Sequence, residues 1–480
     1  MKKNDELLNT KYNEIPKDEY KKANKLVESD IYYRPTYHIA PPNGLLNDPN
    51  GLVYKDGVHH IHYQWTPIQP YHGLKHWRYL TTKNFIDFED HGVSIVPEEE
   101  FEMNGAFSGS AIDLGDKIKL YYTGNIEDES NNIAKEHQIS ADLINGVVTN
   151  KKIAVEWDAT KFTPHARDPK IFEYEGQKYM LFGVQSSDDK DGGLAIYKMI
   201  NEDQFEYKAT LKSNNNYYGY MWECPNLDKV GDKYLFIMSS EGWIKEDDKY
   251  ELNGFRNVVY TLIEKLDFDD TKLNELFEPR TMDYGHDFYA PQTYFENNKL
   301  LVIGWMGAVG VQYPTDQYSW HSMLTIPREL SVEGDNLIQK PYIGFTMNAL
   351  SETETIFDDN LEVNKSIHLK FELDDILEIK ISNDQGENVV ISFSEKEIML
   401  DRDCGSEIVD WDYENPRFAK RKLKEQIVEI FIDSSSIELF ADNYQTIFTS
   451  RFFVKNFNRI ELSKKTNMQV SKIKSIKVIN

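Results

Sequence analysis

The sequence predicts an all-β protein in which a five-bladed β-propeller is followed by a C-terminal β-sandwich. Five candidate β-hairpins recur at intervals of 55 to 66 residues between about residues 47 and 306. The recurrence stops near residue 330, and alternating strand-like sequence resumes after a polar, irregular stretch. Each interval leaves room for two more strands, which is typical of a radial repeat of four-stranded units. The alternative is an irregular β-sandwich whose turns are evenly spaced by coincidence.

The length of 480 residues exceeds what one hydrophobic core usually holds, so at least two domains are expected. We expect a charged N-terminal appendage, a propeller that carries the catalytic site, a linker and a sandwich, over residues 1–30, 31–335, 336–358 and 359–480. Within the appendage, Pro16 precedes a charged stretch that is typical of the start of a short helix.

The chain carries 80 acidic and 54 basic residues, for a net charge of −26. Such a protein is not expected to bind a nucleic-acid backbone or an anionic membrane surface. The N-terminus has no apolar run of signal-peptide type, and no stretch approaches the length of a membrane span. Nothing in the spacing of Cys224 and Cys404 suggests a disulfide. We therefore expect a soluble, cytoplasmic protein.

Each predicted hairpin consists of a strand, a short turn of Gly, Asp, Glu or Asn residues, and a second strand. The five turns lie near residues 57, 115, 176, 231 and 297. Beyond Pro327 this pattern ends, and strand-like runs follow at 367–381, 389–400 and 427–440. These runs predict the sandwich, in which we find no cluster of candidate catalytic residues.

A compact polar motif lies about eight residues before every hairpin turn. The five motifs are Asn47-Asp48-Pro49, Phe107-Ser108-Gly109-Ser110, Arg167-Asp168-Pro169-Lys170, Trp222-Glu223-Cys224-Pro225 and Asp287-Phe288-Tyr289-Ala290-Pro291. Equivalent positions of successive blades face one another around a propeller axis. The motifs are therefore expected to converge at one mouth of the central channel.

This convergence brings together three carboxylates, those of Asp48, Asp168 and Glu223. Carboxylates in one cup repel unless their pKa values are spread apart. Glycoside hydrolysis requires such a spread, because it uses one ionised nucleophile and one protonated acid. The alternative is that each carboxylate caps a strand or pairs with a local base, as Asp168 could with Arg167.

Metal binding is a rival use of clustered carboxylates, since calcium takes several oxygen ligands. The sequence has one carboxylate per motif and no Asp-x-Asp-x-Asp-Gly loop. His60 and His62 share one face of a predicted strand, but two such histidines are more often packing residues than ligands. We expect neither a metal nor an organic cofactor.

Together and in this order, the motifs resemble those of glycoside hydrolase family 32, the β-fructofuranosidases. The match runs over about residues 36–330, with a weaker echo at 430–440. The resemblance implies a propeller followed by a sandwich. It also implies that Asp48 attacks the anomeric carbon of a fructosyl unit, that Glu223 is the acid and base, and that Asp168 holds fructose hydroxyls. Arg167 is expected to keep Asp168 ionised, and Cys224 to be an inert packing group.

The resemblance further implies a fructose subsite with an aromatic wall. Its expected members are Asn47, Gln64, Phe107, Ser108, Arg167 and Trp305, together with Leu45 and Leu46. The family's usual aromatic residue is replaced here by Leu45, which predicts the loss of a stacking surface near fructose.

Two further stretches are similar to the bacterial sucrose-6-phosphate hydrolase branch of the family, namely residues 72–77 and 313–330. In that branch the phosphorylated sugar enters the cell by phosphorylating uptake, which agrees with a cytoplasmic location. A substrate phosphate could be met by basic residues of the first stretch and its flank, which are His72, Lys75, His76 and Arg78. The alternative is that these are solvated loop residues.

The predicted function is retaining hydrolysis of the β-fructofuranosidic bond of sucrose 6-phosphate and of sucrose, with release of fructose. A retaining mechanism implies that the carboxyl groups of Asp48 and Glu223 lie roughly 5–5.5 Å apart. The alternatives are an intracellular fructan hydrolase, a fructosyltransferase, and, from another class, a catalytically silent sugar-binding propeller. The sequence leaves open the phosphate ligands, the substrate preference, the role of the sandwich and the formation of a homo-oligomer.

Overall fold

A computed structural model describes most of the chain, namely residues 4–128, 133–213, 218–243, 249–251, 256–268, 272–273, 279–405, 407, 409 and 415–479. The N-terminal segment contains two α-helices, α1 (Asp5–Leu8) and α2 (Lys17–Glu28). Pro16 immediately precedes α2, so the helix predicted after this proline is present. None of the helices in these ranges is long and apolar enough to cross a membrane.

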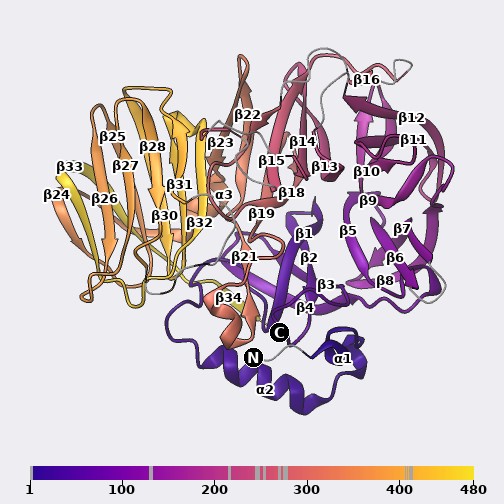
Figure 1. Cartoon of the computed structure of the whole chain (residues 1–480), viewed down its shortest axis with the longest axis horizontal. Coiled ribbons are helices and arrows are strands. Elements are labelled where there is room, and N and C mark those ends of the chain that lie inside the picture. The colour runs from indigo at the N-terminus through magenta and orange to yellow at the C-terminus, as the bar shows by residue number, and fades with distance from the viewer. Residues whose placement is uncertain are drawn as a thin grey trace.

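The middle of the chain forms five sheets, each built on four antiparallel strands and opened by one of the predicted hairpins (Figure 1). The first sheet contains β1 (Gly44–Lys55), β2 (Val58–Thr66), β3 (His76–Thr82) and β4 (Asp87–Ile95). The second contains β5 (Ala106–Asp113), β6 (Ile118–Asp128), β7 (Ile133–Ile144) and β8 (Val147–Val155). The third contains β9 (Phe162–Tyr174), β10 (Gln177–Ser186), β11 (Gly192–Asn201) and β12 (Gln204–Ser213).

The last two sheets are less regular. The fourth contains β13 (Met221–Val230), β14 (Lys233–Glu241), β15 (Arg256–Ile263) and β17 (Arg280–Thr281). The fifth contains β18 (Tyr289–Glu296), β19 (Lys299–Met306), β22 (Arg328–Glu333) and β23 (Asn336–Pro341).

The structure has four complete blades within the described residues, so the prediction of a five-bladed propeller is wrong. In the fourth sheet along the chain, the outer strand β17 has only two residues and pairs with β15 at two positions. In the other four sheets every one of the four strands has at least six residues. The even spacing of the turns reflects only the first hairpin of each four-stranded sheet. It says nothing about the outer strand, which needs its own run of alternating apolar residues.

Short strands and 3₁₀ helices complete this part of the molecule. The strands are β16 (Lys272–Leu273), β20 (Trp320–His321), β21 (Met323–Leu324) and β34 (Lys477–Ile479), and the 3₁₀ helices are Tyr12–Glu14, Glu100–Glu102 and Pro314–Tyr318. A further 3₁₀ helix, Asp442–Tyr444, belongs to the C-terminal part of the molecule. Strand β20 pairs with β1, and β34 brings the C-terminal end of the chain back to the outer edge of β4. The N-terminal helices lie beside this same first sheet in Figure 1.

The C-terminal part is a sandwich-like ten-stranded sheet joined to the propeller by helix α3 (Ile343–Ala349). Its strands are β24 (Leu350–Glu362), β25 (Ile367–Leu373), β26 (Leu377–Ser382), β27 (Asn388–Phe393), β28 (Glu397–Asp401), β29 (Arg417–Lys420), β30 (Gln426–Asp433), β31 (Ser436–Ala441), β32 (Thr446–Arg451) and β33 (Arg459–Ile473). The long strand β33 pairs with β24, β25 and β26 and so belongs to both halves of the sheet.

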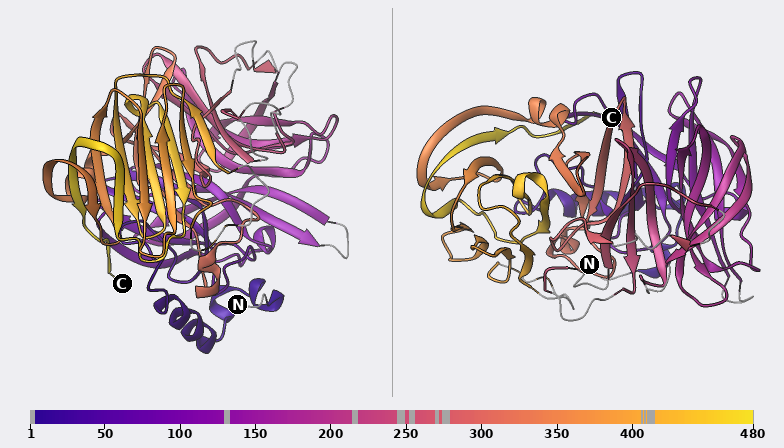
Figure 2. Two further views of the ribbon diagram at one scale, coloured as in Figure 1. Left: turned by 60° about the vertical axis from the view of Figure 1, so that its left-hand side comes forward. Right: turned by 90° about the horizontal axis from the view of Figure 1, so that it is seen from above.

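The sandwich packs against the side of the propeller, as Figures 1 and 2 both show. Phe431 and Phe440 of the sandwich belong to the same buried apolar cluster as strands of the first and last propeller sheets. A buried charge network also crosses this interface. Arg328 of the propeller contacts Glu438 of the sandwich, with 2.7 Å between Nη2 and Oε2, and both side chains are fully buried. The two parts therefore share a single apolar and ionic interface.

Candidate active site

The five polar motifs occupy the same place in the five hairpins, and a β-bulge marks each of them. In every hairpin two residues of the first strand oppose one residue of the second. The bulged pairs are 47–48, 107–108, 168–169, 224–225 and 290–291. In three of them the first residue has a positive φ, namely Asp168, Cys224 and Ala290. A bulge re-aims a side chain out of the regular alternation, which explains how these strand residues turn toward the centre.

Neighbouring hairpins are held together at this level by side-chain to backbone hydrogen bonds. Asn50 Oδ1 accepts from the backbone N–H of Gly109 at 3.0 Å, and Ser110 Oγ donates to the carbonyl of Pro169 at 2.7 Å. Gln292 Oε1 accepts from the N–H of Leu52 at 2.9 Å. These bonds join different sheets, so the bulged positions are held in a common frame.

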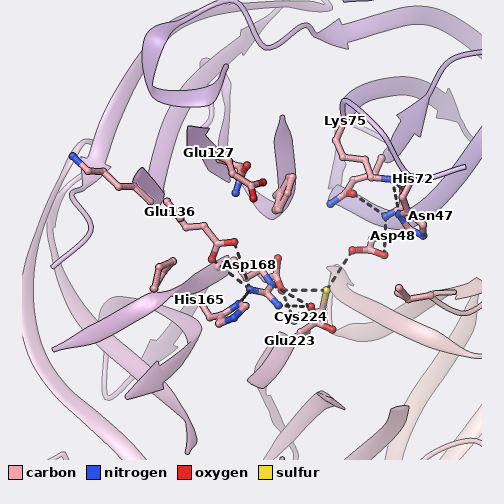
Figure 3. A pocket seen from close by; sticks show the side chains of 18 of the residues that line it. Asn47, Asp48, His72, Lys75, Glu127, Glu136, His165, Asp168, Glu223 and Cys224 are labelled. Atoms are coloured by element: carbon pink, nitrogen blue, oxygen red, sulfur yellow. Dashed lines mark hydrogen bonds and ion pairs between the residues drawn. The ribbon is translucent and has the colours of Figure 1, made fainter. Parts of the chain in front are cut away.

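A cavity of about 390 Å³ lies where the bulged positions meet (Figure 3). All five hairpins contribute to its lining, which consists of Asn47, Asp48, Gln64, His72, Lys75, Phe107, Asn125, Glu127, Ala134, Lys135, Glu136, Pro164, His165, Arg167, Asp168, Glu223, Cys224, Tyr289 and Val309. The three carboxylates named from the sequence, on the first, third and fourth sheets, therefore lie on one cavity.

Asp48 is held by a chain of hydrogen bonds that starts on the neighbouring strand. Gln64 Nε2 donates to Ser108 Oγ at 2.6 Å, and Ser108 Oγ donates to Asp48 Oδ2 at 2.5 Å. Asn47 Nδ2 donates to Gln64 Oε1 at 2.7 Å and to Asp48 Oδ1 at 3.2 Å. Burial raises the pKa of Asp48, the bond from Ser108 lowers it, and the nearby charge of Glu223 raises it again.

Asp168 and Asp48 are linked through Cys224. The backbone N–H of Cys224 donates to Asp168 Oδ2 at 2.8 Å. Its Sγ lies 3.6 Å from the same oxygen and 3.7 Å from Asp48 Oδ2, as the dashed lines in Figure 3 show. Burial and the surrounding carboxylates raise the pKa of the thiol well above its ordinary value, so Cys224 remains protonated. It is therefore a neutral contact between two carboxylates.

Arg167 is directed at Glu223 and not at its sequence neighbour. Its Nη2 and Nε donate to Glu223 Oε1 at 2.8 and 3.1 Å, and its Nη1 lies 3.5 Å from Glu136 Oε2. Tyr289 Oη donates to Glu223 Oε2 at 2.6 Å. Burial raises the pKa of Asp168 to about 8, although the charge of Arg167 opposes this. The expectation that Arg167 keeps Asp168 ionised is therefore corrected.

Of the four basic residues considered for a phosphate, only His72 and Lys75 line the cavity. Lys75 Nζ lies 3.0 Å from Asn47 Oδ1 and 2.9 Å from His72 Nδ1. Burial lowers the pKa of Lys75 to about 7. His76 is fully buried and accepts a bond from the N–H of Tyr12, while Arg78 pairs with Asp90. Neither of the latter two is a solvated loop residue, and neither lines the catalytic cavity.

Four residues expected in the fructose subsite are not among those that line the cavity. Leu45 and Leu46 are buried, at 1% and 0% exposure, and Leu46 belongs to the propeller's apolar cluster. Ser108 acts behind Asp48, as described above. Trp305 is fully buried, and its indole ring packs edge-on against His72 and Tyr289 with centroids 6.1 and 6.4 Å apart.

Five further lining residues were not expected in the site from the sequence, namely Glu136, His165, Tyr289, Lys135 and Glu127. Tyr289 lies in the fifth motif, and its equivalence to the other four motifs is a signal that could have identified it. Glu136 and Lys135 lie on β7, the third strand of the second sheet, outside any motif. Nothing in the sequence indicates that this strand approaches the third sheet.

Within the described ranges, no group of three His, Cys, Asp or Glu side chains is arranged to hold a metal ion. His62 is fully buried and stacks on Tyr79, with ring centroids 4.4 Å apart. His60 lies 2.6 Å from the hydroxyl of Tyr79 through its Nδ1. Burial lowers the pKa of His60 to about 4 and that of His62 to about 3, so both are neutral packing residues.

Two family models match almost the whole chain. The model described as the N-terminal domain of glycosyl hydrolases family 32 matches residues 38–341, and the model of the C-terminal region of the same family matches residues 346–480. The two matched regions correspond to the propeller and to the sandwich-like sheet.

The relatives found by sequence and by structure agree with this assignment. A sucrose-6-phosphate hydrolase of Vibrio alginolyticus is 34% identical over 89% of this chain and 88% of its own. The structure of a sucrose-6-phosphate hydrolase from Lactobacillus gasseri has a TM-score of 0.91 and 26% identity, and covers 99% of this chain and 100% of its own. A β-fructofuranosidase from Bombyx mori, in complex with sucrose, has a TM-score of 0.82 and 25% identity, with coverages of 97% and 100%.

Proposed function

This chain belongs to glycosyl hydrolase family 32 and is a glycoside hydrolase of the β-fructofuranosidase type, and we propose that it cleaves sucrose 6-phosphate and sucrose by a retaining mechanism, releasing fructose. The observation that carries the proposal is the meeting of three carboxylates from three hairpins on one cavity. Two of them, Asp48 and Asp168, contact the same thiol, and the third, Glu223, is held by Arg167.

In the first step Asp48 attacks the anomeric carbon of the fructosyl unit. A new ester bond forms between that carbon and a carboxylate oxygen of Asp48, and the bond to the glycosidic oxygen breaks. Glu223 gives its proton to the departing oxygen. The repulsion between Asp48 and Glu223 supports this division of roles, because a proton on Glu223 makes it easier for Asp48 to be ionised.

In the second step Glu223, now ionised, takes a proton from a water molecule. The water oxygen attacks the same carbon, the ester bond to Asp48 breaks, and fructose leaves with its original configuration. The hydrogen bonds from Arg167 and Tyr289 fit a residue whose charge alternates, since they stabilise the ionised form of Glu223.

Asp168 is proposed to hold fructose hydroxyls. Its Oδ2 accepts the hydrogen bond from the N–H of Cys224, and we propose that Oδ1 is the atom that contacts the sugar. With its pKa raised to about 8, the carboxyl group of Asp168 retains its proton at neutral pH and can donate a hydrogen bond to a sugar oxygen. Asn47, Gln64 and Phe107 supply the remaining walls of this subsite.

The phosphate of sucrose 6-phosphate is proposed to lie near the cations of the cavity. Lys75 and Lys135 line it together with His72 and His165. A phosphate dianion beside Lys75 would raise the pKa of this lysine again, because opposite charges stabilise each other. Since a charged sugar phosphate does not cross a bilayer unaided, we also propose that the enzyme acts in the cytoplasm, where such a substrate is retained.

The substrate preference is tested by measuring kcat/KM on sucrose 6-phosphate, sucrose and inulin. We expect sucrose 6-phosphate to exceed sucrose by about tenfold or more, the effect of one charge-assisted hydrogen bond. Replacement of Lys75 by Met is expected to reduce this ratio. A higher value on inulin would indicate a fructan hydrolase instead. Release of less fructose than glucose or glucose 6-phosphate would indicate a fructosyltransferase.

The pH dependence of the enzyme should report the hydrogen bond between Ser108 and Asp48. Asp48 must be ionised to attack, so kcat/KM falls as the pH drops through its raised pKa. Ser108→Ala removes a bond that lowers this pKa, and we expect the acidic limb of kcat/KM to move up by about one pH unit. The matched control is Ser110→Ala, which loses a bond to the carbonyl of Pro169 and should leave the limb in place. An unmoved limb in Ser108→Ala would contradict the role given to Asp48.

A further inference from the structure

A second cavity, of about 420 Å³, lies on the first sheet where the N-terminal segment and the returning C-terminal strand cover it. Its lining consists of Tyr12, Tyr20, Asn24, Arg34, Ile39, Ala40, Pro42, Asn43, Tyr63, Trp65, Arg78, Leu80, Phe88, Asp90, Ile476 and Val478. It shares no lining residue with the catalytic cavity. Three separate stretches of the chain are needed to build it.

The lining carries a net positive charge, although the chain as a whole has a net charge of −26. Two guanidinium groups, those of Arg34 and Arg78, face one carboxylate, that of Asp90. Arg78 Nη2 lies 2.5 Å from Asp90 Oδ2, so this pair is neutralised. Arg34 is bonded to a backbone carbonyl, that of Pro41, with 2.6 Å between Nη2 and the oxygen. The one carboxylate of the lining is therefore paired with Arg78, and the charge of Arg34 is attracted by that of Asp30, which lies outside the lining.

Three side chains of this lining each carry a buried polar atom that has no hydrogen-bond partner in the described part of the chain. The atoms are Nη1 of Arg34, Nε of Arg78 and the hydroxyl of Tyr20. The two arginine atoms can only donate, and the hydroxyl can donate. Buried donors without an acceptor are rare in native proteins, and their concentration around one cavity indicates a ligand rich in acceptors.

Aromatic rings form part of the wall or lie next to it. Tyr12 packs on Tyr20 and on Trp65, with centroids 5.5 and 5.6 Å apart. The guanidinium of Arg78 lies 5.2 Å from the ring centre of Trp65, and that of Arg34 lies 5.1 Å from the ring centre of Trp320. Both cations thus lie over indole rings within the range of a cation–π interaction, which favours their charged form at this place.

We propose that this cavity is a second, non-catalytic site for a small phosphate monoester, bound through Arg34, Arg78 and Tyr20 with its organic part against the aromatic wall. A phosphate offers several acceptor oxygens and suits the planar donor fork of arginine. The volume and the tyrosine and tryptophan faces suit a compact polar ring such as a hexose. The site goes beyond the proposed function, since none of its residues takes part in the proposed catalytic steps.

The test is calorimetric titration of inorganic phosphate and of glucose 6-phosphate into the full-length protein and four variants. Tyr20→Phe removes only an unpaired hydroxyl, so the fold should be unaffected, and we expect affinity for both probes to fall by about three- to tenfold. Arg34→Met removes the guanidinium and its unpartnered donor and should weaken binding by about tenfold or more. We expect glucose 6-phosphate to bind more tightly than phosphate because its ring meets the aromatic wall.

The other two variants locate the site. Arg459→Met removes a surface guanidinium that pairs with Asp384 on the sandwich and lines neither cavity, and should bind both probes as the unaltered protein does. Lys75→Met removes a cation of the catalytic cavity, so any binding of the probes there should weaken, while the binding that depends on Tyr20 and Arg34 should remain. Absence of saturable binding to the unaltered protein, or equal affinities in Tyr20→Phe, Arg34→Met and the unaltered protein, would overturn the proposal. So would binding that is lost in Lys75→Met and retained in Tyr20→Phe, and none of these results depends on turnover of sucrose 6-phosphate.

Discussion

Replacement of Asp48 by Asn is expected to lower kcat on sucrose 6-phosphate by roughly 10⁴-fold or more while the protein stays folded. An amide cannot form the ester that splits the reaction into two steps. It has the shape of the carboxyl group and can keep bonds to Ser108 and Asn47. Release of fructose, followed at saturating substrate, measures the loss.

A measurement of thermal stability distinguishes this loss of catalysis from a loss of folding. Burial raises the pKa of Asp48, so the ionised carboxylate disfavours the folded state above the ordinary pKa of an aspartate. The neutral amide removes that penalty, and the melting temperature of Asp48→Asn should therefore equal or exceed that of the unaltered enzyme at neutral pH. A matched control is Glu127→Gln, a cavity carboxylate with no part in the proposed steps, which should lower kcat by less than about tenfold. Near-normal turnover in Asp48→Asn would mean that another group is the nucleophile.

Replacement of Arg328 by Met is expected to destabilise the protein by about 3–5 kcal/mol. Arg328 Nη1 lies 3.0 Å from Asp283 Oδ2, Nη2 lies 2.7 Å from Glu438 Oε2, and all three side chains are fully buried. Methionine fills much of the same volume but leaves two carboxylates in the interior without their shared cation. The expected loss of stability comes from burying two unpaired carboxylates, and it is larger than the net stabilisation that the intact ion pairs provide.

The unfolding midpoint in urea or on heating measures this loss. Because Asp283 and Arg328 belong to the propeller and Glu438 to the sandwich, we expect the two parts to lose their cooperative unfolding as well. Arg459→Met provides the comparison, since its partner Asp384 is exposed and such surface pairs contribute about 0–1 kcal/mol. Equal midpoints in the two variants would show that the buried network does not hold the interface.

Some features could be read directly from local sequence. Turn residues followed by apolar alternation mark each hairpin, because both depend on neighbouring residues. The position of the polar motif ahead of each turn is local as well, and it predicted that Asp48, Asp168 and Glu223 would face one cavity. All three do line it.

Other features depend on contacts between distant residues. The outer strand β17 is reduced to two residues, which the spacing of turns could not reveal. The direction of Arg167, toward Glu223 and away from Asp168, follows from the place of the third sheet beside the fourth. Lys75, just before β3, lines the catalytic cavity, and Arg78, on β3, lines the second cavity. Which cavity a basic residue reaches depends on how its side chain is directed by the surrounding fold.

By itself, therefore, the sequence determined the all-β class, the hairpins, the family resemblance and the three carboxylates, because each has a signal confined to a few adjacent residues. Only the tertiary structure decided the number of complete blades, the burial of Leu45 and Trp305 behind the site, and the pKa of Asp168. The physical reason is the same in each case. Burial and electrostatic interaction act between groups that are close in space, and the bulges and sheet packing that bring them together involve residues far apart in the chain.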